Sequence, residues 1–459
     1  MPNSSASELR DTSKTSHASR APSLSGDFAK DAAAFSKFWL DDLAQIDACP
    51  PRAKRSDAEQ TQVAALLRDG RASRSAFLRV HAPTLYRQLT DNLASFRRVE
   101  ELAELAASKV SGLCPTPSRL AKESALVQSE KDGHEIDQGL FFNQVLGDEA
   151  CGRHLCHAML LPRREAVELL PQLKRDGRVD LERASVERRG KASIVTMKNG
   201  RYLNAEDDGT VKSVETAVDL AMLDPDTSIC VLRGGEIEEG KYKGKATFCT
   251  GINLTHLYYG RISYLWYLIR ELGFINKIYR GLATTDMPPD EINGETLEKP
   301  WIAAVDKFAI GGGCQYLLVM DYNIAASDAY MTLPARKEGI VPGAANLRMP
   351  RFVGDRITRQ AVMSERRIDC DSPEGRMICD EIVPPDQLDA AVDRTIVGLT
   401  SSGVVSASSN RKSFRIAQET IDQFRSYMAV YAREQAYCHF SPALIGNLER
   451  FWNAQERKM

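Results

Sequence analysis

The sequence predicts an α/β core that lies between two helical regions and follows a disordered tail. Three observations lead to this fold class. Apolar residues recur every three or four positions from about 30 to 185, short strand-like runs alternate with helical patterns after Gly190, and helical spacing returns from about 405. We therefore divide the chain into a disordered tail (1–28), a helical N-terminal domain (29–188), an α/β core (189–400) and a C-terminal helical extension (401–459).

The composition is that of an ordinary globular protein. Of 459 residues, 43% are hydrophobic and 27% are charged, and 60 basic against 62 acidic residues leave a net charge of −2. With this balance, the chain has no overall positive electrostatic potential that would attract nucleic acids or anionic membranes. Ten cysteines are scattered along a chain without an apolar signal segment, and no stretch approaches the ~18 apolar residues of a membrane span. We expect a soluble, cytoplasmic protein with reduced thiols.

The first 25 or so residues are rich in Ser, Ala, Thr and Arg, as transit peptides are. The acidic residues Glu8, Asp11 and Asp27 argue against that alternative and favour a disordered tail.

The N-terminal domain is predicted from two helical stretches. After Pro83 a single apolar stripe is formed by Leu85, Leu89, Leu93, Phe96, Val99, Leu102 and Leu105. Pro115 and Pro117 end this run. The second stretch covers about 135–175, with interruptions at Pro162 and Pro171 and a stop at Gly177.

The core is predicted from strands and helices in alternation. Strand-like runs cover 193–197, 228–232 and 301–308, an amphipathic helix covers 214–223, and a buried helix is expected over 314–326. In the extension, one helical side is formed by Ile416, Ile421, Phe424, Met428 and Tyr431.

Four potential metal ligands stand close together at Cys151, His154, Cys156 and His157. On a helix these positions do not converge on one ion, because only Cys151 and His154 share a face. We therefore expect no metal. The sequence contains neither HExxH nor GxSxG, so a metalloprotease or a serine hydrolase is not supported.

The most informative local motif is the glycine triplet Gly311–Gly313, which follows a strand-like run and opens a helix. Glycines let the backbone approach a ligand closely, and a helix start presents free N–H groups, as an anion or oxyanion site needs. A tight strand-to-helix turn that needs glycine for steric reasons alone is the alternative.

Several motifs together resemble the enoyl-CoA hydratase/isomerase, or crotonase, superfamily over roughly 190–400. These are Asn204-Ala205, the loop Phe248–Leu254, the glycine triplet and Pro342-Gly343-Ala344. The resemblance implies a ClpP-like spiral α/β core. It also implies that the backbone N–H groups of Ile252 and Gly312 polarise an acyl-CoA thioester carbonyl and stabilise an enolate.

The two acid/base glutamates of that superfamily are replaced. Gln315 stands at the first position and does not exchange a proton near neutral pH, and Ala335 stands at the second, eight residues before Gly343. Hydration of an enoyl double bond is therefore not expected. A shift of one to three residues in this count, toward Arg336-Lys337-Glu338, would restore a carboxylate.

This modified pattern is similar to one branch, the (3,5-dihydroxyphenyl)acetyl-CoA 1,2-dioxygenases that help to supply dihydroxyphenylglycine for nonribosomal peptide antibiotics. The similar runs are Gly251–Tyr258, Pro334–Arg351 and Tyr427–Leu448, and a helical domain before the core is also typical of the branch. The resemblance implies an oxidoreductase without metal or organic cofactor. The enolate reduces O2, and the peroxide attacks the thioester, releasing CoA and 3,5-dihydroxyphenylglyoxylate.

The same resemblance assigns residues to the substrates. Leu254, Ala335 and Ile340 are expected to line an apolar oxygen pocket, with ordinary core packing as the alternative for Leu254 and Ile340. Ring hydroxyl groups need polar partners, and the resemblance points to Glu206, Arg270 and Gln315. Surface ions are the alternative for Glu206 and Arg270.

Lys241, Lys243 and Lys245 precede the oxyanion loop and are candidates for contacts to CoA phosphates, with a solvated loop as the alternative. Crotonases assemble as trimers or dimers of trimers, so a homotrimer or homohexamer is expected. Two other functions stay open: an arylacyl-CoA thioesterase or isomerase that uses the same oxyanion hole, and a non-catalytic subunit that binds acyl-CoA.

Overall fold

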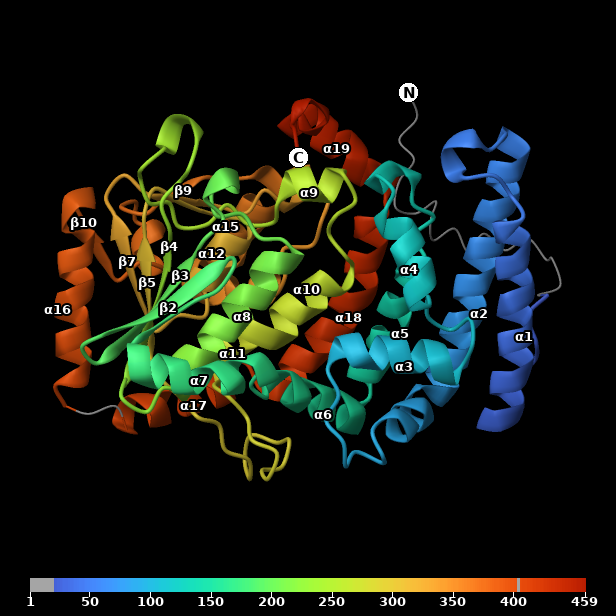
Figure 1. The fold of residues 1–459 in the computed structure, drawn as a ribbon, viewed down its shortest axis with the longest axis horizontal. Coiled ribbons are helices and arrows are strands. Elements are labelled where there is room, and N and C mark those ends of the chain that lie inside the picture. The colour runs from blue at the N-terminus through green and yellow to red at the C-terminus, as the bar shows by residue number, and fades with distance from the viewer. Residues whose placement is uncertain (1–19, 403–404) are drawn as a thin grey trace.

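The computed structural model describes residues 20–402 and 405–459, which form a helical N-terminal region, an α/β core and C-terminal helices (Figure 1). The helices of the N-terminal region are α1 (Phe28–Asp47), α2 (Asp57–Leu89), α3 (Val99–Lys109), α4 (Pro117–Ser124), α5 (Ile136–Gly147), α6 (Glu149–Leu160) and α7 (Arg164–Asp176).

Most of the predicted tail, residues 1–19, lies outside the described residues. The rest of it contacts α1. The backbone N–H groups of Ser25 and Gly26 donate to Asp31 at 2.8 and 3.1 Å, and the Asp27 side chain caps α1 by accepting from Lys30 N–H. The described end of the tail is thus held by local hydrogen bonds to the first turns of α1.

The single apolar stripe predicted after Pro83 is wrong, because two helices share it. α2 continues through Pro83 and ends at Leu89, and α3 begins only at Val99. Between them, Asp91, Asn92 and Leu93 have φ angles of 49°, 58° and 69°. Such left-handed residues end a right-handed helix, although the spacing of the apolar side chains runs on across the turn.

The second predicted stretch is divided by Pro162, which lies between α6 and α7. Gly177 ends α7 with a φ of 68°, as a glycine at a helix C-terminus does. Pro171 lies on the exposed side of α7 and does not interrupt it.

A seven-stranded sheet organises the core. In spatial order its strands are β1 (Arg178–Asp180), β2 (Ala184–Arg189), β3 (Ala192–Met197), β4 (Ile229–Gly234), β5 (Trp301–Val305), β7 (Tyr322–Ala326) and β10 (Glu381–Val383). β1, β2 and β3 are antiparallel neighbours and the other pairs are parallel. The sheet begins at Arg178, so the predicted boundary at 188 falls inside β2.

The sheet is buried on both faces. Ile194, Val231 and Ile302 pack on one face with residues of α16, whereas Val195 and Leu232, on the other face, belong to the main core. Strands that are buried on both faces have continuous apolar sequences rather than alternating apolar and polar residues.

This property explains an error in the prediction. The helix expected over 314–326 ends at Leu317, where α12 (Gly312–Leu317) stops, and 322–326 form β7 between β5 and β10. Periodicity does not separate a short buried strand from a buried helix. A smaller sheet contains β6 (Phe308–Ile310), β8 (Tyr330–Thr332) and β9 (Ile368–Asp369).

The other core helices connect or cover these strands. They are α8 (Asp208–Leu223), α9 (Leu254–Tyr258), α10 (Leu265–Arg270), a π-helical segment (Glu271–Ile275), α11 (Asn276–Arg280), α13 (Ala335–Glu338), α14 (Ala345–Arg348), α15 (Pro350–Ser364) and α16 (Leu388–Thr400).

The C-terminal helices are α17 (Val405–Gln418), α18 (Ile421–His439) and α19 (Pro442–Trp452). α18 packs against α5 and α6 and runs between the N-terminal helices and the core (Figure 1). Ile421, Phe424, Met428 and Tyr431 all lie in α18 and are buried. Ile416 does not belong to their side, because it lies in α17 and is 50% exposed. Among the described helices none is long and apolar enough to cross a membrane.

A buried ion cluster joins the N-terminal region to the core. Lys277 Nζ lies 2.8 Å from both Glu215 and Asp219, and these three side chains are fully buried. Arg98 and Arg163, from the N-terminal region, also donate to Glu215. Burial raises the pKa of Asp219 to about 6, so this carboxylate depends on the lysine for its charge.

We expect Lys277→Met to lower the free energy of unfolding by about 3–5 kcal/mol, because it leaves a buried carboxylate without its cation. Lys174→Met, on the exposed face of α7, is the control and should change this free energy by less than about 0.5 kcal/mol. Denaturant unfolding of the three proteins measures the difference. Equal stabilities of the two variants would contradict a stabilising role for the cluster.

Candidate active site

Two loops meet through glycine where β6 leads into α12. Gly251 has a φ of +74°, and a Cβ atom on it would lie 2.7 Å from the backbone nitrogen of Gly312. Both the left-handed backbone and this close approach require glycine at 251. The contact brings Ile252 next to Gly312.

The backbone N–H groups of Ile252 and Gly312 are free to bind a ligand. Glu206 pairs with the backbone on either side of Ile252: its N–H donates to Gly251 O and its carbonyl accepts from Asn253 N–H, at 2.7 Å each. Ile252 N–H therefore faces the other way, and Gly312 begins α12, where N–H groups lack helical partners. Within the described part of the chain neither N–H donates to a protein acceptor.

Asn204 holds the segment that carries Glu206. Its Nδ2 donates to Gly235 O and to Thr247 O at 2.8 Å each, and its Oδ1 accepts from Asn199 N–H at 3.0 Å. One side chain thus connects the loop before Glu206 to the chain that leads into the oxyanion loop.

Arg270 is the centre of a buried polar cluster. It donates through Nε to Glu206 (2.9 Å), through Nη1 to Glu271 (2.5 Å) and to Gln315 Oε1 (2.7 Å), and through Nη2 to Gly312 O (3.0 Å). Burial alone would lower the pKa of Arg270, but the Glu206 and Glu271 carboxylates outweigh burial and hold this pKa well above its ordinary value. The guanidinium stays charged between two carboxylates.

Tyr316 completes the surroundings of Glu206. Its hydroxyl donates to Glu206 at 2.6 Å, and burial raises the pKa of Tyr316 well above its ordinary value. The Tyr316 ring also lies 5.1 Å from Arg270 Cζ, within cation–π range. The Glu206 carboxylate is thus fully buried and accepts hydrogen bonds from both Arg270 and Tyr316.

Arg270 and Glu271 are consecutive, yet both contribute to one cluster. The helix changes from α10 to the π-helical segment at Glu271, and the backbone angles at Gly273 are not helical. π-Helical insertions change the direction of the side chains that follow and are frequent at functional sites. Glu271 also accepts from Ala344 N–H at 3.1 Å, which ties α10 to the loop after Gly343.

These groups surround one pocket. Its wall is made of Ile252, Trp266, Tyr267, Arg270, Glu271, Gly311, Gly312, Gln315, Leu333, Ala335, Glu338, Ile340, Val341, Pro342 and Tyr431. Both free N–H groups lie on residues of this wall, next to apolar and aromatic side chains. The pocket therefore combines two free N–H donors with apolar and aromatic side chains, an arrangement that can stabilise a developing oxyanion.

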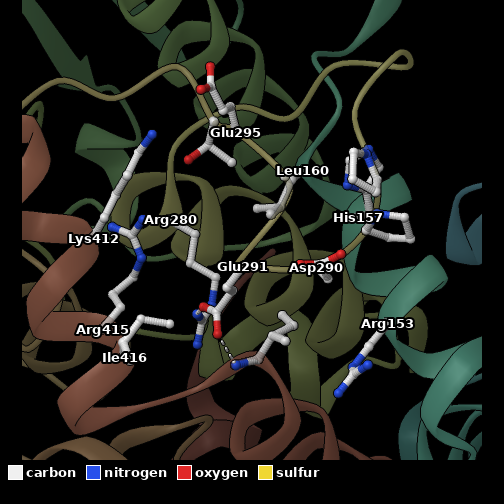
Figure 2. Close-up of a pocket in the computed structure, with 15 residues that line it drawn as sticks. Arg153, His157, Leu160, Arg280, Asp290, Glu291, Glu295, Lys412, Arg415 and Ile416 are labelled. Atoms are coloured by element: carbon white, nitrogen blue, oxygen red, sulfur yellow. Dashed lines mark hydrogen bonds and ion pairs between the residues drawn. The ribbon is translucent and has the colours of Figure 1, made fainter.

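A second pocket, with about 620 Å³ of empty space, is lined by residues of α6, α11, α17 and the loop before β5 (Figure 2). Its arginines have partners: Arg280 pairs with Glu291, Arg415 with Glu298 and Arg153 with Asp422. It lacks the pair of free backbone N–H groups, so the pocket at Ile252 and Gly312 is the candidate active site.

The enoyl-CoA hydratase/isomerase family matches residues 292–430. The (3,5-dihydroxyphenyl)acetyl-CoA 1,2-dioxygenase of Amycolatopsis orientalis is 43% identical over 407 residues, which cover 88% of this chain and 92% of that protein. This chain belongs to that dioxygenase family within the crotonase superfamily.

Hydratases of the superfamily match a smaller part of the chain. The short-chain-enoyl-CoA hydratase of Clostridium acetobutylicum is 27% identical over 46% of this chain and 72% of its own length. A solved enoyl-CoA hydratase from Mycobacterium avium subsp. paratuberculosis K-10 is 18% identical, with a TM-score of 0.48 over 59% of this chain and 98% of that chain. The 43% identical relative and the match to the enoyl-CoA hydratase/isomerase family confirm the predicted crotonase core and its family.

The structure brings together most of the site residues that were predicted for this dioxygenase family member from its sequence. Ile252, Gly312, Arg270 and Gln315 lie on the wall of one pocket. Ala335 and Ile340, expected at the oxygen pocket, lie there too.

Five predicted residues are not part of this wall. Glu206 lies behind Arg270, and Leu254 is buried in α9. Lys241, Lys243 and Lys245 are exposed on the loop around the 3₁₀ turn Gly240–Tyr242, where Lys241 lies over the Tyr242 ring. The structure thus provides no contact between these lysines and the pocket.

Sequence reasoning missed Glu271 and Tyr316 and named Glu338 only through a shift in the count. Each stands within three residues of one that was identified: Glu271 follows Arg270, Tyr316 follows Gln315, and Glu338 stands three residues after Ala335. This closeness to an identified residue on a short helical segment was the signal that could have pointed to them.

The cysteine and histidine cluster of α6 is involved in packing. His154 Nδ1 lies 2.8 Å from Tyr86 Oη, and His157 Nε2 lies 2.8 Å from Thr284 O. Burial lowers the pKa of His154 to about 4. Within 20–402 and 405–459, no group of three or more His, Cys, Asp or Glu side chains is placed to hold a metal ion.

We expect Arg270→Met to lower the free energy of unfolding by about 3–5 kcal/mol at pH 8, because Glu206 and Glu271 lose their shared cation. Both carboxylates are then buried without a compensating charge, and removing one partner of a buried ion pair is strongly destabilising.

Denaturant unfolding at pH 8 measures this loss. Tyr316→Phe removes only one hydrogen bond to Glu206 and is the control, with an expected loss of about 1 kcal/mol. Equal losses for Arg270→Met and Tyr316→Phe would contradict the role of Arg270 as the shared cation.

Proposed function

We propose that this chain is a dioxygenase that converts (3,5-dihydroxyphenyl)acetyl-CoA and O2 to 3,5-dihydroxyphenylglyoxylate and free CoA without a metal or organic cofactor. The observation that carries the proposal is its 43% identity to a dioxygenase of that name, over 92% of the relative's length. The pocket supports it by pairing free Ile252 and Gly312 N–H groups with an apolar wall at Ala335 and Ile340.

In the proposed reaction the thioester oxygen binds to the N–H groups of Ile252 and Gly312. These donors stabilise the enolate that forms when the benzylic carbon loses a proton, and one such donor is typically worth about 2.7–4 kcal/mol of barrier. The enolate transfers electrons to O2, and a C–O bond forms at the benzylic carbon. Attack of the resulting peroxide on the thioester carbonyl expels CoA. Loss of the second benzylic proton, as the O–O bond breaks, then gives the α-keto acid.

The dihydroxyphenyl ring is proposed to bind beside Gln315. Because Arg270 donates to Gln315 Oε1, the amide Nε2 is left as a donor for a ring hydroxyl. Glu206 supports this arrangement indirectly, since it holds Arg270. Leu254 and the three lysines are assigned no contact with the ring.

The other features of the proposal concern the whole enzyme. A cytoplasmic location and assembly into homotrimers or homohexamers stay predictions. A thioesterase or isomerase on the same scaffold is the competing activity, and it differs in releasing CoA, or moving a double bond, without consuming O2.

The test is uptake of O2 with (3,5-dihydroxyphenyl)acetyl-CoA in an oxygen electrode, with excess EDTA and with a thiol reagent to follow CoA. We expect one O2 consumed for each CoA released, undiminished by the chelator. CoA release without O2 uptake would identify a thioesterase instead. Loss of uptake on adding EDTA would contradict metal independence.

We expect Gln315→Leu to lower kcat/KM for the dihydroxy substrate by about tenfold to a hundredfold, because a ring hydroxyl loses its partner in a buried site. Unsubstituted phenylacetyl-CoA lacks that hydroxyl and is the internal control, for which the change should be within about threefold. Steady-state kinetics with both thioesters measure the ratio. Equal losses for the two substrates would remove Gln315 from ring recognition.

A further inference from the structure

Glu338 is a buried carboxyl group on the wall of the candidate active site. It is 3% exposed, and it stands at the end of α13, three residues after Ala335. Residues three apart on a helix share a face, so both side chains contribute to the same wall. Its two carboxyl oxygens lie 3.7 and 3.8 Å from the position that a Cβ atom on Gly311 would occupy. Gly311 directly precedes the oxyanion donor Gly312.

Glu338 differs from the other carboxylates of the site in having no partner. Glu206 and Glu271 both accept from Arg270, and each accepts a further hydrogen bond from Tyr316 or Ala344. Across the described residues, no donor makes a hydrogen bond or ion pair to the Glu338 side chain. Buried carboxyl groups are otherwise almost always paired, so an unpaired one facing a pocket is a candidate for a role in chemistry.

We propose that Glu338 is the base that removes the benzylic proton of the arylacetyl-CoA substrate. The inference rests on the proposed function and identifies the residue that starts its reaction. The C–H bond at the benzylic carbon breaks, an O–H bond forms on the Glu338 carboxylate, and the electron pair moves onto the thioester oxygen held by the Ile252 and Gly312 N–H groups. No oxidant is needed for this step, and O2 reacts only with the enolate that it produces.

The surroundings of Glu338 suit this role. Burial raises its pKa to about 8, which makes its carboxylate a stronger base than an exposed glutamate and brings its pKa near the usual working pH. Arg270 is fixed by its own carboxylates, so it does not neutralise Glu338. Ala335, on the same wall, is small and leaves space in the pocket beside Glu338.

The experiment separates proton removal from oxygen chemistry. Exchange of the benzylic hydrogens of (3,5-dihydroxyphenyl)acetyl-CoA is followed by mass spectrometry in D2O under anaerobic conditions, and O2 uptake is measured separately. In Glu338→Gln, which keeps the shape but not the basicity, both rates should fall at least about 100-fold. Anaerobic titration should give a Kd for the thioester within threefold of the wild-type value.

Two further variants complete the design. Glu338→Asp keeps a carboxylate that is shorter by one methylene group and should retain intermediate exchange, which a purely structural role would not produce. Arg336 lies on the exposed side of the same helix, so Arg336→Gln is the control and should catalyse exchange of the benzylic hydrogens at the wild-type rate.

The outcomes distinguish the inference from the proposed function. Exchange by Glu338→Gln at the wild-type rate would overturn the inference and leave the dioxygenase in place. Absence of both exchange and O2 uptake in the wild-type protein would overturn the proposed function and the base together. Loss of both rates in Glu338→Gln, with binding retained, supports the inference.

Discussion

The guanidinium group of Arg270 holds together the segments from which the pocket is built. Its four donated hydrogen bonds reach Glu206 before α8, Glu271 in the π-helical segment, and Gly312 and Gln315 in α12. The Gly312 bond fixes the carbonyl of a residue on the pocket wall whose own N–H has no protein acceptor in the described part of the chain. A planar cation with donors in fixed directions is suited to this task, and a lysine would not hold four acceptors at once.

The C-terminal helix α18 closes the same pocket from the other side. The Tyr427 hydroxyl donates to Gly343 O at 2.5 Å, Gln435 accepts from Val341 N–H at 2.8 Å, and Tyr431 lies on the wall. α18 is itself held by the N-terminal region, where Gly139 of α5 packs on Ala432 and Ala436. The helical regions are thus part of the site, in agreement with a relative that resembles this chain over nearly its whole length.

Much of this arrangement was predictable where a residue type has one physical use. The glycine triplet Gly311–Gly313 indicated a site where the backbone approaches a ligand closely, and Gly311 and Gly312 lie on the pocket wall. The prediction was wrong where one sequence pattern fits several structures. Residues 322–326 form a strand, although a buried helix would have the same apolar composition. Leu93 continues the spacing of an apolar helical stripe, although it lies in a turn. Glu206 was identified, but sequence could not place it behind Arg270, because that depends on tertiary packing.

The replacement of an expected glutamate by Ala335 illustrates why a site is better described by its geometry than by a position in a motif. A helix returns to the same face after three or four residues, so Ala335 and Glu338 are adjacent on the wall although they are separate positions in the sequence. Moving a carboxyl group by one helical turn frees space at 335 while keeping an ionisable group in the pocket. That combination fits oxygen chemistry, which needs proton removal and an apolar volume beside the same carbon.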